Sequence, residues 1–125
     1  MREIKFRAWD ENRKKWVYFR LDEIVNINHE SLTDDEWAFI QLKNIGQYTG
    51  LKDKNGREIY EGDIVRFKDW WDEEMVGEVR YSEKDMAFTI VNDFWDGFPI
   101  MYADDLEVIG NIYENPELLE EAEND

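Results

Sequence analysis

The alternation of hydrophobic and polar side chains is clearest at the start of the chain. Residues 2–9 alternate with the period of two that is typical of a half-buried β-strand. Polar residues 10–15 interrupt this pattern, and residues 16–21 are again rich in aromatic and β-branched side chains. We therefore predict an N-terminal β-hairpin with a connection somewhat longer than the tightest turns.

The middle of the chain gives a weaker pattern followed by a clear turn. Residues 22–35 are irregular and contain Ser, Thr and Asp side chains that suit a turn or the start of a helix. Residues 36–43 fit either a strand or a short helix, and we predict a strand. Asn55 and Gly56 then lie between two apolar positions, where a turn with positive φ favours these residue types, so a second hairpin is predicted there.

The second half of the chain predicts short strands at close spacing. A small SH3-like barrel needs about five such strands, because closing the sheet buries one face and removes open edges. Gly77 and Gly110 fall inside two of them and indicate bulges or bends. The predicted strands are residues 63–67, 76–81, 87–91, 100–102 and 106–113.

Together these elements predict a mainly β protein. An N-terminal hairpin-containing subdomain of residues 1–60 is expected to pack on a C-terminal SH3-like small barrel of residues 61–113. Residues 114–125 form a short acidic tail, in which Pro116 predicts one helical turn before a frayed end.

Composition limits the class of protein. Hydrophobic residues make up 42% of the chain and aromatic residues 15%, enough to bury a core, so disorder of the whole chain is disfavoured. The absence of cysteine excludes disulfides and thiolate chemistry and fits a reducing compartment. No apolar run approaches the roughly 18 residues of a membrane span, and the charged opening residues do not resemble a signal peptide. We expect a cytoplasmic protein with no membrane partner.

Charge is distributed unevenly. The formal net charge is -16, but residues 1–20 contain seven basic and three acidic residues, a net of +4, which leaves -20 for the remainder. Such a surface repels phosphate and attracts cationic partners over about a Debye length, roughly 10 Å at 0.1 M salt. Direct binding of nucleic acid through most of the surface is therefore disfavoured.

Three strings of the sequence resemble the YopX family of bacteriophage and prophage proteins. They are REIKFRAWD at residues 2–10, QYTGLKDKNGREIYEGDIV at 47–65 and EVIGNIYENPELL at 107–119. The resemblance therefore extends from one end of the chain to the other. It implies a phage or prophage origin, a mostly β fold, association into a homo-oligomer and no assigned function, and it supplies no catalytic residues. Residues 22–46 and 69–101 have the least family character, so we expect partner specificity there.

The residues themselves predict no catalytic, cofactor or metal site. The glycine-rich string at residues 48–63 lacks the Gly-Lys-Ser/Thr of a phosphate-binding loop, and a calcium loop starting at Asp53 would need glycine where Glu58 stands. Its glycines are better explained by turns. Acidic pairs such as Asp34 and Asp35 are chain neighbours that share one solvated environment, and His29 is the one histidine.

Four aromatic residues are the candidate partner-binding residues. They lie beside acids in the second half of the chain, and they are Trp70, Trp71, Phe94 and Trp95. Aromatic rings framed by carboxylates bind cationic or peptide partners by stacking and cation–π contact. The alternative is that these rings fill an interface with the N-terminal half or with another subunit.

The leading functional prediction is a non-enzymatic accessory protein that binds a protein partner, either a host or phage protein or a second copy of itself. One alternative is an acidic mimic of nucleic acid that occupies a host DNA-binding protein. Another is a nucleic-acid-binding barrel that uses the basic hairpin, where Trp9 and Trp16 lie among the charges. A divalent-metal hydrolase is the weakest, because carboxylates from separate strands would have to converge on one ion.

Overall fold

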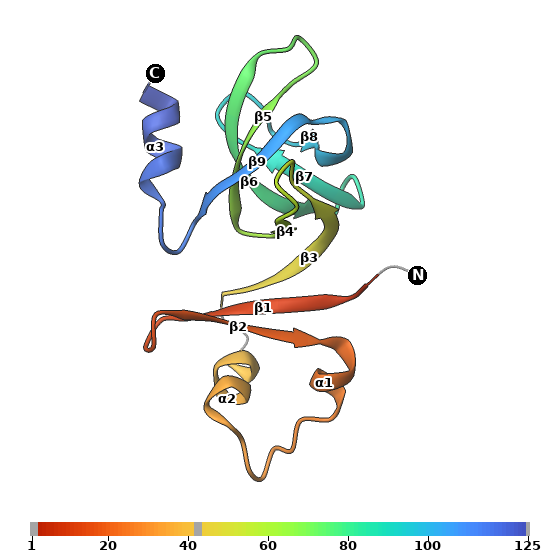
Figure 1. Cartoon of the computed structure of the whole chain (residues 1–125), viewed down its shortest axis with the longest axis vertical. Helices are drawn as coiled ribbons and strands as arrows, with labels where there is room; N and C mark the ends of the chain where they lie inside the picture. Colours follow the sequence, from red (N-terminus) through yellow and green to blue (C-terminus); the bar gives the residue numbers. More distant parts are fainter. Residues whose placement is uncertain (1–2, 42–43, 125) are drawn as a thin grey trace. The chain divides into compact units, whose positions relative to one another are not determined.

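The computed structural model describes residues 3–41 and 44–124 and divides into two compact units. Unit 1 is Met1–Gly50 and unit 2 is Leu51–Asp125. The fold is mainly β, with two antiparallel sheets, as the sequence predicts (Figure 1).

Unit 1 is built on the predicted N-terminal hairpin. Strand β1 (Lys5–Asp10) pairs with β2 (Lys15–Arg20) without interruption, from Lys5 opposite Arg20 to Asp10 opposite Lys15. Strand β3 (Ile45–Lys52) pairs antiparallel with the other edge of β1. With β4 (Glu58–Tyr60) at its end, the sheet has the order β2-β1-β3-β4.

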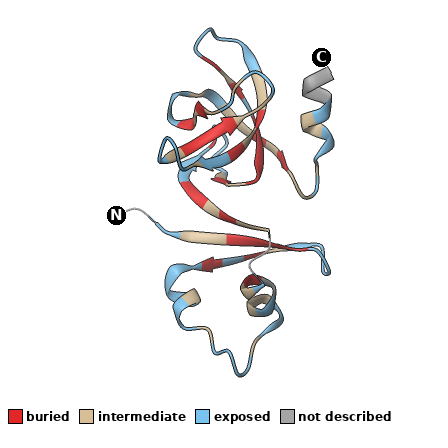
Figure 2. Ribbon diagram, turned by 180° about the vertical axis from the view of Figure 1, so that it is seen from behind, coloured by how far each residue is buried: buried red, intermediate tan, exposed pale blue. Residues whose placement is uncertain are grey.

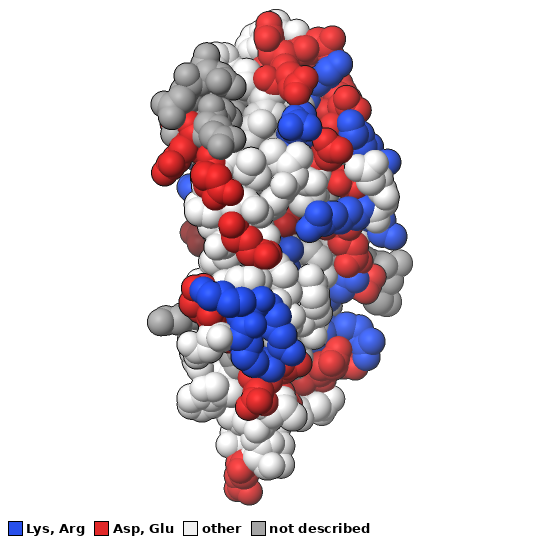
Figure 3. Space-filling model, turned by 60° about the vertical axis from the view of Figure 1, so that its left-hand side comes forward, with Lys and Arg blue, Asp and Glu red and all other residues white. Residues whose placement is uncertain are grey.

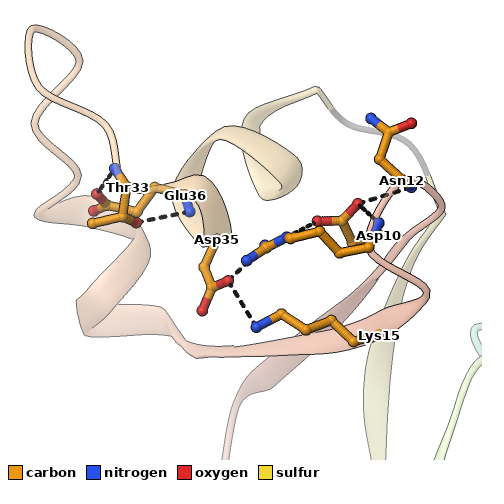
Figure 4. Close-up of polar contacts among 7 residues, drawn as sticks. Asp10, Asn12, Lys15, Thr33, Asp35 and Glu36 are labelled. Carbon is orange, nitrogen blue, oxygen red and sulfur yellow. Dashed lines mark hydrogen bonds and ion pairs between the residues drawn. The ribbon is translucent and has the colours of Figure 1, made fainter.

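Two short helices follow the hairpin, where the sequence predicts irregular chain and then a strand. Helix α1 is Leu21–Val25 and helix α2 is Asp34–Ile40. The Thr33 hydroxyl accepts the backbone N–H of Glu36 at 3.1 Å, and the Glu36 carboxylate accepts the backbone N–H of Thr33 at 3.0 Å (Figure 4). This reciprocal cap satisfies two donors that a helix start leaves open. The predicted strand at 36–43 is therefore wrong, and its residues 42 and 43 lie outside the described part.

Helix α2 closes the core of unit 1 through Phe39. The Phe39 ring lies 4.8 Å from that of Phe19 and 6.4 Å from that of Phe6, measured between ring centres. Ala8 and Val17 are buried in the same cluster. Figure 2 shows this burial along the strands, while much of the helix and loop surface is exposed.

Unit 2 contains a five-stranded antiparallel sheet of order β8-β7-β6-β5-β9. Four of the five predicted strands are confirmed, with slightly different ends. Along the described chain the pairing gives an open order with β8 and β9 at the two edges, so closure into an SH3-like barrel stays a prediction. The strands are β5 (Asp63–Lys68), β6 (Glu74–Ser82), β7 (Ala87–Val91), β8 (Phe98–Pro99) and β9 (Asp104–Asn111).

The predicted strand at residues 100–102 is wrong, because these residues form a 3₁₀ helix, η1 (Ile100–Tyr102). Ala103 donates its N–H to the carbonyl of Ile100 at 3.1 Å and closes this turn. Pro99 precedes it and has no N–H to continue a strand ladder.

The two glycines inside strands have different roles. At Gly110 the β5–β9 pairing shifts register, as the predicted bulge requires, and an added Cβ would lie 2.8 Å from Leu118 Cδ1. Gly77 is regularly paired, but an added Cβ would lie 2.6 Å from Ile90 Cγ2. Gly77 therefore permits close approach of neighbouring strands instead of a bulge.

The C-terminal residues form helix α3 (Glu117–Asn124), which is longer than the single predicted turn. Ile59 of β4 is buried in the same cluster as Val65, Phe67 and Phe98, so β4 belongs to the core of unit 2. This explains why the units divide after Gly50, whereas the sequence places a boundary after residue 60. Within the described residues, no helix is both long and apolar enough to cross a membrane.

Candidate partner-binding surface

The turn between β5 and β6 is held by the buried carboxylate of Asp69, which is 3% exposed. Its Oδ1 accepts the backbone N–H groups of Trp71 at 3.0 Å and Glu73 at 3.1 Å. The backbone adds two bonds, from Asp69 N–H to the Glu73 carbonyl and from Asp72 N–H to the Asp69 carbonyl. All four of these hydrogen bonds involve Asp69, so the turn has a fixed shape and holds Trp70 and Trp71 at the surface.

The loop between β7 and β8 is held in a similar way by Asn92. Its Oδ1 accepts the backbone N–H groups of Phe94 at 2.9 Å and Trp95 at 2.6 Å, and its Nδ2 donates to the Val76 carbonyl at 2.9 Å. The two loops are joined because Trp95 Nε1–H donates to Asp69 Oδ2 at 3.3 Å.

The aromatic rings of these loops rest on the core of unit 2. Phe98 is fully buried, and its ring centre lies 5.3 Å from that of Phe67. Trp70 packs on Phe98 at 4.9 Å, and Trp95 meets it edge-on at 5.0 Å. The inner layer of rings is therefore continuous with the hydrophobic core.

An outer layer of rings lies on this inner layer. Trp71 stacks on Trp95 with ring centres 5.8 Å apart and planes 19° apart, and Phe94 meets Trp95 edge-on at 5.4 Å. Tyr102 of η1 lies 5.1 Å from Trp70. We call these five residues, Trp70, Trp71, Phe94, Trp95 and Tyr102, the aromatic platform.

The platform is solvent-exposed. Trp71 is 66% exposed, Phe94 64% and Trp70 52%, whereas Trp95 is partly buried. A large aromatic side chain presents about 150–250 Å², so these rings leave several hundred Å² of apolar surface in water, an area that marks interaction sites. The structure thus brings all four predicted residues together.

The residues that hold this surface, Asp69 and Asn92, are not among those predicted from the sequence. Asp69 and Asn92 each stand two residues before a ring that they position, which is the spacing of Asp and Asn side chains that bond their own backbone in turns. That signal was available in the sequence. The contact of Tyr102 with Trp70 depends on η1 and had no local signal.

Acidic residues stand beside the rings in sequence on the same two loops. Asp72 and Glu73 are exposed on one loop, Asp93 and Asp96 on the other, and neither loop contains a Lys or Arg. Lys68 Nζ lies 3.9 Å from Asp72 Oδ1 in an exposed, weak pair. The surface therefore combines aromatic faces with negative charge.

The glycine-rich string is a structural turn, as the sequence predicts. Asp53 Oδ1 accepts the backbone N–H groups of Asn55 and Arg57, both at 2.9 Å, and its Oδ2 accepts that of Val108 at 2.9 Å. Gly56 has the positive φ of 83° that this turn requires. All of the Asp53 bonds go to backbone groups that shape the fold.

The acidic residues and the single histidine are the remaining candidate groups. Within residues 3–41 and 44–124, no three His, Asp or Glu side chains come together in a way that would hold a metal ion. His29 is exposed on the segment between α1 and α2.

In unit 1, ion pairs tie the β1–β2 turn to helix α2. Arg13 Nε pairs with Asp10, and Arg13 Nη2 lies 2.6 Å from Asp35, which Lys15 also approaches at 3.6 Å (Figure 4). The Arg13 guanidinium bond lowers the pKa of the Asp10 carboxyl. A cavity of about 630 Å³ lies beside this network, lined by Trp9, Asp10, Glu11, Asn12, Arg13, Asp34, Trp37, Gln41 and Asn44.

The basic hairpin is less solvated than its sequence indicates. Arg7 is 3% exposed, and its guanidinium carbon lies 3.8 Å from the centre of the Trp16 ring. Lys14 pairs with Glu11 and Arg20 with Asp22. Figure 3 shows basic side chains gathered on one face of unit 1 with acidic side chains beside them. Much of this positive charge is therefore compensated within unit 1.

Comparison with known proteins agrees with this architecture. No curated protein matches the chain. The crystal structure of protein EF1440 from Enterococcus faecalis is similar over 93% of this chain and 97% of that one, with 33% sequence identity and a TM-score of 0.56. The family model described as YopX protein matches residues 5–120, nearly the whole length. The chain therefore belongs to the YopX family.

Proposed function

We propose that this protein is a phage- or prophage-encoded accessory protein that recognises a protein partner through the aromatic platform, without catalysing a reaction, in the bacterial host cell. The observation that carries the proposal is the exposure of Trp70, Trp71 and Phe94 on loops fixed by Asp69 and Asn92. Exposed aromatic side chains on a rigid support are typical of binding hot spots.

Two features favour recognition over chemistry. The buried carboxylates of Asp53 and Asp69 are occupied by N–H donors, and the remaining acids near the platform are exposed. Acid–base catalysis needs two carboxyls in distinct environments, whereas these exposed carboxylates share one solvated environment. The partner can be a host protein, another phage protein or a second copy of this chain.

The second candidate is an acidic mimic of nucleic acid. Its support is the charge distribution, because the chain has no Lys or Arg from residue 85 to its end while acids are frequent there. A basic groove of a DNA-binding protein attracts such a surface. Direct binding of nucleic acid has less support, because basic side chains of the N-terminal hairpin are paired with nearby acids.

The test is affinity capture from host lysate with the tagged full chain at low and high salt, followed by identification of bound proteins and nucleic acids. The captured protein is then purified and its binding measured for the wild type, the double variant Trp71→Ala/Phe94→Ala and the control Trp37→Ala. Trp37 is 57% exposed in unit 1, close to the 66% of Trp71, so it matches the loss of an exposed indole.

We expect the double variant to lose binding at least about tenfold and the control to retain it. Equal binding by all three proteins would refute the platform as the recognition surface. Capture of a DNA-binding protein that is released by salt and binds the double variant as well as the wild type would favour the mimic. Recovery of nucleic acid alone would favour a nucleic-acid-binding module.

A further inference from the structure

We infer that the aromatic platform binds an arginine side chain of the partner, with the guanidinium lying on Trp71 and its N–H groups directed to carboxylates of the two loops. The inference rests on the proposed function and specifies the chemistry of the occupant. Its three supports are the stacking of the rings, the charge of the loops and the rigidity of their backbone.

The ring geometry leaves an indole face available. Trp71 stacks on Trp95 with planes only 19° apart, so one face of Trp71 is covered by another ring. Trp71 is nevertheless 66% exposed, which leaves its opposite face to solvent. The face of an aromatic ring carries negative charge density, and tryptophan binds cations better than tyrosine or phenylalanine does.

The loop charges select a cation. Asp72 and Glu73 on the first loop and Asp93 and Asp96 on the second are all exposed. Neither loop contains a basic residue that would neutralise these acids. Lys68, the last residue of β5, approaches Asp72 in a weak pair. Carboxylates on both ring-bearing loops repel phosphate and carboxylate ligands and attract a positively charged side chain.

Arginine fits this combination better than lysine. Its guanidinium is planar, so it stacks on an indole while its N–H groups point outward in the plane toward carboxylates at the rim. A lysine ammonium is a compact, strongly hydrated charge that cannot do both in the same way. A flat ring with acids on the flanking positions is therefore a site for guanidinium.

The platform is also organised before binding. The Asp69 and Asn92 side chains fix both loops, and the bond from Trp95 Nε1 to Asp69 joins them. A surface that is already ordered loses less conformational freedom when a ligand binds. The five rings do not have to be assembled by the partner.

The test uses three short peptides added to the full-length protein, with arginine, lysine or citrulline at one central position of a glycine–serine background. Citrulline has the shape of arginine without its charge. Binding is followed by the NMR signals of the indole N–H groups of the 6 Trp residues, which single Trp→Phe variants assign. We expect the arginine peptide to shift the signals of Trp70, Trp71 and Trp95 and to bind about tenfold more tightly than the citrulline peptide.

Charge variants test the role of the carboxylates. Asp93→Asn/Asp96→Asn is expected to weaken binding of the arginine peptide several-fold, whereas Glu83→Gln, an exposed acid on the β6–β7 turn, leaves it unchanged. Equal affinity for the citrulline peptide would overturn the inference. So would shifts confined to the indole signals of Trp9, Trp16 and Trp37, since these would indicate general attraction to a chain of net charge -16.

The same reagents separate this inference from the proposed function. Suppose that capture of the partner requires Trp71 and Phe94 but is unchanged in the Asp93→Asn/Asp96→Asn variant and is not inhibited by the arginine peptide. The platform then recognises its partner by other chemistry, and only the arginine inference fails. If the Trp71→Ala/Phe94→Ala variant also captures the partner as well as the wild type does, both the proposed function and the arginine inference fail.

Discussion

Two turns of unit 2 have the same backbone construction and very different surfaces. In residues 53–57 and again in residues 69–73, a buried Asp side chain accepts the N–H groups two and four positions later. In both turns the residue three positions later has a positive φ, 83° at Gly56 and 61° at Asp72. The second carboxylate oxygen then bonds a distant group, Val108 N–H in one turn and Trp95 Nε1–H in the other.

The difference lies in the residues between the fixed positions. The first turn carries Lys54 and Asn55, and the second carries Trp70 and Trp71. Because the first turn forms without aromatic residues, the turn geometry does not require tryptophan. The turn alone therefore does not account for the two tryptophans. Trp70 also packs on Phe98, and the exposure of Trp71 is what binding to a partner would require.

The largest effect is expected for Asp53→Asn. The amide oxygen could keep the N–H groups of Asn55 and Arg57, but the amide nitrogen would then face the buried Val108 N–H, which would lose its acceptor. A buried donor without a partner costs about 1–3 kcal/mol, and we expect a loss of about 2–3 kcal/mol in the free energy of unfolding, measured by urea denaturation. The control Asp85→Asn removes an exposed acid and should change it little. An unchanged urea midpoint for Asp53→Asn would contradict the structural role of the first turn.

Asp69→Asn should have a smaller effect on stability and a larger one on the platform. The amide oxygen can still accept the two turn N–H groups, but its nitrogen would then face Trp95 Nε1–H. We expect a loss of about 1–2 kcal/mol, because a single side-chain donor loses its acceptor. The indole N–H signal of Trp95 should also move and its hydrogen exchange should accelerate. If Asp69→Asn leaves the Trp95 signal unchanged, the two loops are not coupled through this bond.

This comparison also shows why the sequence predicts one turn and misses the other. Asn55-Gly56 is a recognisable signal because glycine adopts positive φ without steric cost. The second turn places Asp72 at the corresponding position, so no glycine indicates it. The clustering of the four aromatic residues beside acids is visible in the sequence, and their role in binding stays a prediction. The bond from Trp95 Nε1–H to Asp69 joins two separate loops and had no local signal.

Most strands could be predicted from the sequence, whereas two short helical elements could not. The N-terminal hairpin and the strands around Val65 and Ile90 follow from periodicity, because burial of one or both faces fixes their patterns. Helix α2 was missed because its short run of apolar residues fits either period, and only the Thr33–Glu36 cap decides the outcome. The 3₁₀ turn at η1 was missed because three apolar residues after a proline also resemble an edge strand.

Acidification sharpens the comparison through the pKa of Asp53. Burial alone raises this pKa, but the N–H groups of Val108, Arg57 and Asn55 together outweigh burial and lower it. A carboxyl with a depressed pKa in the folded state stabilises the fold above its unfolded pKa, about 4, and loses this contribution as the pH falls through the folded value. We expect the free energy of unfolding to decrease below about pH 4, with a shallower decrease for Asp53→Asn. Urea denaturation at several acidic pH values measures the free energy of unfolding of both proteins against pH. Identical slopes for the two proteins would exclude a contribution of Asp53 to the loss of stability in acid.

The smallest effect is expected for an exchange of the positive-φ residues. Asp72→Gly should stabilise the protein by about 0.5 kcal/mol, because glycine adopts this backbone conformation without the penalty that a Cβ imposes, although it also gains freedom in the unfolded state. Loss of the exposed Lys68–Asp72 pair should matter little. The reciprocal change Gly56→Asp is the matched control: nothing lies within 4 Å of the added Cβ, so it should destabilise by backbone conformation alone. Urea denaturation measures both. If Asp72→Gly stabilises the fold but weakens binding of the arginine peptide, Asp72 is retained at a strained position for recognition; if it destabilises the fold, the two turns are not equivalent.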